Sequence, residues 1–224
     1  MSVTNLKTKV IAVGLCAILV AGCSVLSPQP DRSRFYILTP VSDGGAIAAM
    51  PAPTGPNSQL TIGVGPVDFP DYLRRLSVVT RVAPNRIELS DEKRWAEPLD
   101  KNFIRVLSEN LATLLNTYRI EKFPWALKTQ VDYQIEVDVQ RFETDSDGQT
   151  QLIASWIIRD GPSSKILYAS ETNTGSPAGT DEASASAALS RDLATLSKEI
   201  ASRVTELNQH HIRNNADSNS ASES

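Results

Sequence analysis

An alternation of apolar and polar residues near the middle of the chain constrains the fold most strongly. From residue 131 to residue 140 the sequence is VDYQIEVDVQ, with an apolar residue at every odd position and a polar one at every even position. Successive side chains of a β-strand point to opposite faces, so the pattern predicts a strand with one buried and one polar face. A sheet built on such a strand needs a second layer against its apolar face.

Two helical patterns can supply that layer. Apolar residues recur every three or four positions after Pro98, a residue that suits the first turn of a helix, and again through residues 181–208. The first stripe consists of Phe103, Leu107, Leu111 and Leu114, and the second of Leu189, Leu193, Leu196, Ile200, Val204 and Leu207. We therefore expect two amphipathic helices.

Short apolar segments bounded by turn residues predict the remaining strands. They are residues 34–38, 60–67, 76–82, 86–89, a short one near residue 120, 152–158 and 166–172. Residues 152–158 are apolar at both odd and even positions, which predicts a central strand covered on both faces. The order is four strands, a helix, four strands and a helix. It predicts an α/β fold, a single domain with a mixed β-sheet and helices packed on it.

The N-terminus carries the pattern of an export signal. Lys7 and Lys9 precede an apolar run at residues 10–21, and small residues lead to Cys23. About twelve apolar residues make roughly 18 Å of helix, which is too short to cross a bilayer core of about 30 Å. The segment VAGC at residues 20–23 resembles the bacterial lipobox, which implies cleavage between Gly22 and Cys23 and acylation of Cys23. An ordinary signal peptide cleaved near residues 21–22 is the alternative.

An acylated Cys23 would fix the location of the protein. Two or more acyl chains hold a protein stably to a bilayer. In bacterial lipoproteins an Asp after the acylated Cys favours the inner membrane, and Ser24 stands there in this chain. The resemblance therefore implies a lipid anchor on the periplasmic face of the outer membrane. Cys16, the other cysteine, lies in the segment to be removed, so no thiol remains for a disulfide or a metal site.

Composition divides the rest of the chain. We expect a lipoprotein signal peptide at residues 1–22, a lipidated tether at 23–33, a folded domain at 34–208 and a disordered polar tail at 209–224. The formal net charge is −4, and −6 once the two lysines of the signal are removed. An acidic surface argues against nucleic acid as a partner.

Two motifs carry a resemblance to a known family. Residues 65–75 (GPVDFPDYLRR) and 94–99 (RWAEPL) resemble segments of the ABC-type transport auxiliary lipoprotein family, and the similarity extends over roughly residues 34–208. The resemblance implies an α/β domain on a mixed sheet. It also implies partners, namely a mammalian-cell-entry (MCE) domain transport protein and inner-membrane components, in a system that moves lipids between membranes and protects the outer membrane.

The same two motifs supply candidate docking residues. They are Tyr72, Arg74, Arg75, Arg94 and Trp95, because Arg and Trp are favoured at interface hot spots and the turn after Pro70 would present its residues at a sheet edge. Each has a structural alternative. The RWAEPL segment would also serve as the entry to the first helix, and the residues after Pro70 would also cap the core.

Catalytic and metal-binding patterns fail on inspection. The two histidines, His210 and His211, lie at the start of the expected tail, where they are poor candidates for a positioned base. Glu143, Asp145 and Asp147 imitate the start of a calcium loop, but the residue at the twelfth position is Ala154 instead of an acid, so we expect a hairpin turn. We expect a non-enzymatic protein with no cofactor and no metal.

Three other functions stay open. A small lipid carrier would need an apolar cavity between the sheet and the helices. An auxiliary lipoprotein of another ABC transporter would share the same family motifs. The apolar stripe of residues 181–208 would also suit a homo-oligomer, but we expect it to pack on the sheet.

Overall fold

A computed structural model describes residues 32–41, 53–126, 128–179 and 181–222. Its contacts divide the chain into residues 1–32 and 33–224, and the fold described below is that of the second unit. The predicted signal peptide, the Gly22–Cys23 cleavage site, Cys23 itself and most of the tether lie outside the described residues.

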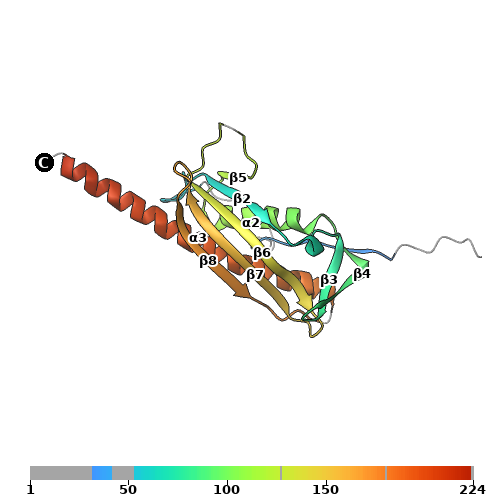
Figure 1. The fold of residues 1–224 in the computed structure, drawn as a ribbon. Coiled ribbons are helices and arrows are strands. Elements are labelled where there is room, and N and C mark those ends of the chain that lie inside the picture. The colour runs from blue at the N-terminus through green and yellow to red at the C-terminus, as the bar shows by residue number, and fades with distance from the viewer. Residues whose placement is uncertain (1–31, 42–52, 127, 180, 223–224) are drawn as a thin grey trace, which may run out of the picture. The chain divides into compact units, whose positions relative to one another are not determined.

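The described chain folds into eight strands and two long helices (Figure 1). The elements are β1 Arg34–Tyr36, β2 Ile62–Asp68, the 3₁₀ turn η2 Asp71–Leu73, β3 Ser77–Ala83, β4 Arg86–Trp95, α2 Leu99–Leu115, β5 Ile120–Lys122, β6 Tyr133–Asp145, β7 Thr150–Asp160, β8 Ile166–Thr174 and α3 Glu182–Ser222. This order is the predicted one: four strands and a helix, followed by four more strands and a second helix. The predicted α/β fold with a mixed sheet is confirmed.

Strand β6 joins the parts of the sheet. One edge pairs with β7 over its whole length, from Tyr133↔Asp160 to Thr144↔Thr150, and β8 follows on β7. The other edge is divided. Its first half pairs in parallel with β2, which carries β5, and its end pairs in parallel with β3, which carries β4 and then β1. The sheet therefore has two arms on one side of β6, and short strands β1 and β5 end them.

Both helices lie on one face of the sheet, behind it in Figure 1. Phe103 of α2 is fully buried and makes edge-to-face contacts with Phe69 at 5.1 Å and with Phe142 of β6 at 5.3 Å between ring centroids. Asn110 of α2 donates from Nδ2 to Ser197 Oγ of α3 at 3.0 Å. The core thus lies between the apolar face of the sheet and the two apolar helix stripes.

The one-sided arrangement corrects the expectation for residues 152–158. Leu152, Ala154, Trp156 and Ile158 are at most 3 % exposed, but the alternate residues of β7, including Ile153 and Ile157, are only half-buried. No helix of the described chain covers that second face. The expectation of a strand covered on both faces is wrong because both helices pack on the same side.

The predicted disordered tail is also corrected. Helix α3 continues to Ser222, and its side chains from Gln209 to Ser218 are exposed. The segment contains no Gly or Pro to end a helix, and Ser218 Oγ donates back to the Asn214 carbonyl at 2.8 Å. Its last side chain buried against the domain is Asn208, which donates from Nδ2 to Asn57 Oδ1 at 2.9 Å.

The aromatic contacts of Phe103 give a test of this core. Phe103→Ala should lower the free energy of unfolding by about 3–5 kcal/mol, because it removes a buried ring and leaves a cavity. Phe35→Ala is the matched control, since Phe35 is 64 % exposed. It should change stability by less than about 0.5 kcal/mol. Urea unfolding of both variants measures the difference, and equal stabilities would contradict the packing described.

Candidate docking surface

Two of the five candidate docking residues belong to the structural framework. Trp95, at the end of β4, is 4 % exposed, so its indole lies in the core and is closed to a partner at this surface. Tyr72, in η2, is half-buried and packs against the core. Arg74, Arg75 and Arg94 are exposed.

The RWAEPL segment brings β4 into α2. Pro98 is the residue immediately before the helix, and its carbonyl accepts the hydrogen bond from Asn102 N at 3.0 Å. Glu97 pairs with Arg105, eight residues further along the chain, at 3.2 Å between Oε1 and Nε. Trp95 is buried at the end of β4, and Glu97 and Pro98 lead directly into α2, which favours the helix-entry interpretation for these three residues.

Tyr72 is held by a buried carboxylate that the sequence did not single out as a structural centre. The Glu143 side chain is 0 % exposed and accepts from Arg81 Nε at 2.6 Å, from Arg141 Nε at 2.8 Å and from the Tyr72 hydroxyl at 2.8 Å. The network joins η2 and β3 to β6. It therefore fixes one arm of the sheet to the central strand.

The network shifts the pKa values of its members. Burial raises the pKa of the Glu143 carboxyl, but the hydrogen bonds from Arg81, Arg141 and Tyr72 outweigh it, so the pKa is lowered from 4.5. Burial and the hydrogen bond to Glu143 raise the pKa of Tyr72 to about 12. At neutral pH the centre is therefore a carboxylate held by two guanidinium groups and a neutral phenol.

The exposed candidates lie at the edge where β1 ends the sheet. Phe35 of β1 is opposite Arg94 of β4, and Arg94 is in turn opposite Ser77 of β3. Trp95 N donates to the Leu76 carbonyl at 2.7 Å, which places Leu76 at the same edge. We call Phe35, Ile37, Arg75, Leu76 and Arg94 the β1-edge surface.

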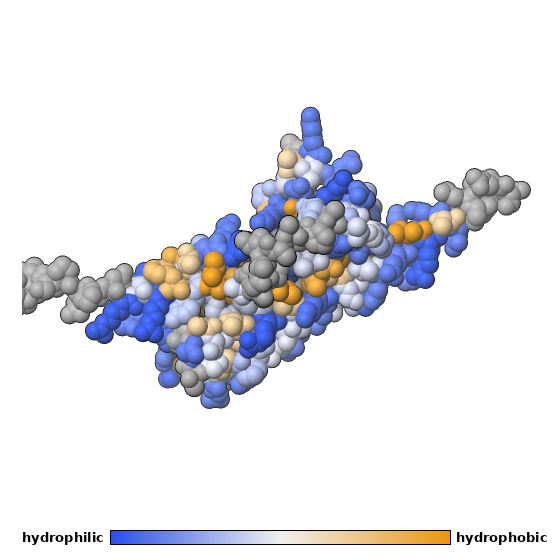
Figure 2. All heavy atoms as spheres, turned by 180° about the vertical axis from the view of Figure 1, so that it is seen from behind, coloured by the Kyte–Doolittle hydropathy of each residue, from blue (hydrophilic) through white to orange (hydrophobic). Residues whose placement is uncertain are grey.

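This surface is partly apolar. Phe35 is 64 %, Leu76 47 % and Ile37 45 % exposed. Figure 2, seen from the helix side, shows apolar atoms gathered at the end of the molecule where the described chain begins. Sequence analysis missed the three apolar residues, because only the pairing of β1 as an edge strand leaves them uncovered. Arg74 is less available, since its Nε donates to the Phe69 carbonyl at 3.1 Å.

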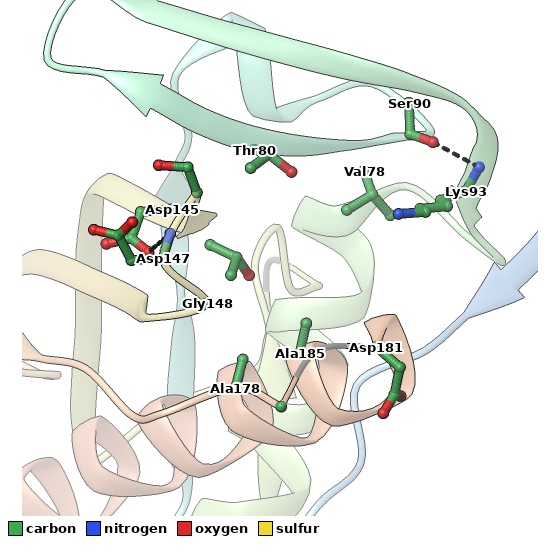
Figure 3. Close-up of a pocket in the computed structure, with 13 residues that line it drawn as sticks. Val78, Thr80, Ser90, Lys93, Asp145, Asp147, Gly148, Ala178, Asp181 and Ala185 are labelled. Carbon is green, nitrogen blue, oxygen red and sulfur yellow. Dashed lines mark hydrogen bonds between the residues drawn. The ribbon is translucent and has the colours of Figure 1, made fainter.

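A cavity of about 480 Å³ lies between β3, β4, the β6–β7 hairpin and the start of α3 (Figure 3). Hydroxyl and charged side chains line much of it, including Thr80, Ser90, Lys93, Asp145 and Asp181. An acyl chain needs an apolar lining. With this mixed lining, the cavity gives no support to the lipid carrier considered as an alternative function.

The acidic stretch before Gly148 is a hairpin turn, as predicted. Asp145 Oδ1 accepts from Asp147 N at 2.9 Å and from Gln149 N at 2.8 Å, and Gly148 has a positive φ of 73°. Glu143 instead accepts hydrogen bonds from Arg81 and Arg141. Among the described residues no group of three or more His, Cys, Asp and Glu side chains is arranged to hold a metal ion.

The buried Asp192 of α3 has a structural environment. It accepts hydrogen bonds from Thr150 Oγ1 at 2.5 Å and from Ser176 Oγ at 2.6 Å, and burial raises its pKa. Through these bonds Asp192 fastens the chain between β8 and α3 to the sheet.

His210 and His211 lie on the exposed end of α3.

The described chain is a single α/β domain built on a mixed sheet with two helices packed on it. None of the helices in the described part of the chain is long and apolar enough to cross a membrane. The model of the ABC-type transport auxiliary lipoprotein component family matches residues 45–201, and the chain belongs to that family. The family resemblance found in the sequence is thus confirmed.

Two curated relatives are intermembrane transport lipoproteins. The chain is 25 % identical over 146 residues to the intermembrane transport lipoprotein PqiC of Escherichia coli K12 and to that of Shigella flexneri. The match covers 65 % of this chain and 72 % of each relative. The chain is therefore a distant homologue of PqiC.

Solved structures share the fold. A crystal structure of a Xanthomonas campestris protein has a TM-score of 0.61 at 15 % identity and covers 80 % of this chain and 99 % of its own. A crystal structure of an uncharacterized protein has a TM-score of 0.59 at 20 % identity and covers 77 % of this chain and 98 % of its own. At these identities the likeness establishes the fold alone.

The depressed pKa of Glu143 gives a pH prediction. A carboxyl whose pKa is lower in the folded state than in the unfolded chain stabilises the fold. This stabilisation is fully present at pH values above the pKa of the unfolded chain, which is 4.5 for Glu143. That contribution is lost as the pH falls through the folded pKa. Glu143→Gln should therefore lower the free energy of unfolding at pH 7 by about 2–3 kcal/mol. This is less than the cost of breaking a fully buried ion pair, because the arginines reach solvent. The difference from wild type should shrink below pH 4.5.

Urea unfolding at pH 7 and pH 3.5 measures this effect. Glu88→Gln is the matched control, because the Glu88 carboxylate is 65 % exposed and pairs with Arg86 at 3.6 Å. It should change stability by less than about 0.5 kcal/mol at either pH. If the free energy of unfolding of Glu143→Gln lies below that of wild type by the same amount at both pH values, the Glu143 carboxylate does not supply the stabilisation.

Proposed function

We propose that this chain is a lipid-anchored, non-enzymatic subunit of an MCE-type intermembrane lipid-transport system. In this proposal Cys23 is acylated and holds the domain to the periplasmic face of the outer membrane, where the chain contributes to membrane integrity. Membership of the auxiliary lipoprotein family and distant homology to an intermembrane transport lipoprotein support it. The lipobox-like VAGC segment supplies the site of the anchor.

The β1-edge surface carries the docking part of the proposal. It combines exposed apolar side chains, including Phe35 on the short edge strand β1, with Arg94 of the neighbouring β4 and with Arg75. Arg is enriched at interface hot spots, and an apolar centre with a polar rim is the usual anatomy of an interface. The partner that this surface would bind is the MCE-domain protein or an inner-membrane component of the same system.

The position of this surface suits a subunit that bridges from its own membrane. β1 follows directly on the predicted tether at residues 23–33, so the surface lies at the part of the sheet that the anchor would hold. A partner that binds there would be held close to the anchoring membrane.

Replacing Cys23 tests the anchor. Cys23→Ala should move the protein out of the outer-membrane fraction or leave it unprocessed, and cells that carry it should become sensitive to detergent. Density-gradient fractionation and growth in sodium dodecyl sulfate measure the two effects. Ser24→Ala is the control and should behave like wild type. Normal fractionation and normal resistance of Cys23→Ala would refute the role of the anchor.

Charge and apolar variants at the β1 edge test docking. Phe35→Asp with Arg94→Glu should reduce co-purification of the MCE-domain protein by about tenfold or more, since hot-spot losses are typically 2 kcal/mol or more. Both side chains are exposed, so folding should be unchanged in thermal unfolding. Lys101→Glu on the exposed side of α2 is the matched control. Undiminished co-purification of the double variant would rule out this surface.

A further inference from the structure

The arm of the sheet that ends in β5 carries two aromatic rings seated on glycines. In β2 the residues Ile62 and Val64 are buried in the core at 0 % and 1 % exposure. Gly63 and Gly65 alternate with them and therefore face the side of the sheet away from the helices. A Cβ on Gly63 would lie 2.8 Å from the ring of Trp125, and one on Gly65 would lie 2.7 Å from Cβ of Phe123. The two glycines thus make room for the segment that follows β5.

The seated rings are only partly covered. Phe123 and Trp125 meet edge to face, with ring centroids 5.5 Å apart and planes at 86°. Phe123 is nevertheless 51 % exposed, and Trp125 is half-buried. Tyr118, just before β5, is 55 % exposed. The pair is held in place from one side and offers its other side to the surroundings.

The same edge is locally basic in an acidic protein. Arg119 and Lys122 are exposed at the two ends of β5, and Lys128 is exposed further along. The acid of this segment is the half-buried Glu121, and the nearby Asp132 accepts a hydrogen bond from Thr61 N at 2.7 Å. We call Tyr118, Arg119, Lys122, Phe123 and Trp125 the β5-edge surface. Its positive charge contrasts with the net charge of −4 of the whole chain.

We infer that the β5-edge surface binds the headgroup region of an anionic phospholipid bilayer. Aromatic side chains favour the membrane–water interface, where an apolar ring and a polar neighbourhood are both accommodated. Lys and Arg beside them are attracted to anionic headgroups. If the rings served only to cover Gly63 and Gly65, half of Phe123 would not need to remain exposed next to Lys122. Charge complementarity therefore favours an anionic lipid surface as the occupant.

The inferred contact is compatible with the proposed anchor and docking surface. β1 and β5 end the two separate arms of the sheet, so the two surfaces are formed by different strands and do not overlap. The inference does not rest on the docking proposal, and either can fail alone.

Tryptophan fluorescence gives a direct test in the full chain. The protein is reconstituted into vesicles of phosphatidylethanolamine and phosphatidylglycerol that carry bromine on their acyl chains, which quench nearby indoles. Trp95 and Trp156 are 4 % and 3 % exposed and serve as internal references. We expect clear quenching in wild type and none in Trp125→Phe, because Trp125 is the indole at the inferred contact.

Charge variants make the test specific. Arg119→Glu with Lys122→Glu should reduce the quenching at least about fivefold, as expected for the loss of two basic contacts to an anionic surface. Vesicles of phosphatidylcholine alone should give the same reduced value with the wild-type chain. Lys101→Glu, exposed on α2, is the matched control and should quench like wild type.

Three results would overturn the inference. They are a lack of quenching in wild type, equal quenching in Trp125→Phe, and quenching that is indifferent to both the charge variants and the lipid charge. Circular dichroism of each variant verifies that the fold is retained. If a variant fails to fold, the comparison of anionic with neutral vesicles on the wild-type chain decides the outcome alone.

Discussion

The pairing of β6 along both of its edges is the constraint on which the rest of the structure depends. One edge carries β7 and β8, and the other carries two separate arms that begin with β2 and β3. The apolar residues of β6 face the two helices, while the Glu143 carboxylate at its end binds Arg81 of the β3 arm. If β6 slipped by one residue, its buried side chains would face solvent and both arms would lose their partner.

This arrangement produces two free ends with different chemistry. The arm that ends in β1 exposes Phe35 beside Arg94, and the arm that ends in β5 exposes Phe123 beside Lys122. Edge strands ordinarily need protection against unwanted pairing, and the strands that end the two arms, β1 and β5, are each only three residues long. Short edges with exposed aromatic and basic side chains suit recognition of partners by side chains. In the proposed function, the β1-edge surface is the one that binds a transport partner.

The local features of the fold could be predicted from the sequence. Period-two alternation gave β6, helical spacing gave α2 and the packed part of α3, and Asp147-Gly148 gave the hairpin. Three features depend on tertiary structure. The one-sided coverage of β7 follows from where both helices pack, the burial of Trp95 follows from its position at the junction of β4 and α2, and the exposure of Phe35 follows from the pairing of β1 with β4. The helical end of α3 beyond Asn208 was missed because its polar composition says little about local helix formation.

Docking at the β1 edge is the central functional claim. It is tested most directly by a photo-crosslinking amino acid placed at position 35 in the full chain, in intact cells, with position 101 on the exposed side of α2 as the reference. The account predicts a crosslink from position 35 to the MCE-domain protein or an inner-membrane component of the system, and no such product from position 101. Equal products from both positions, or none from position 35 in cells where the system is assembled, would contradict it.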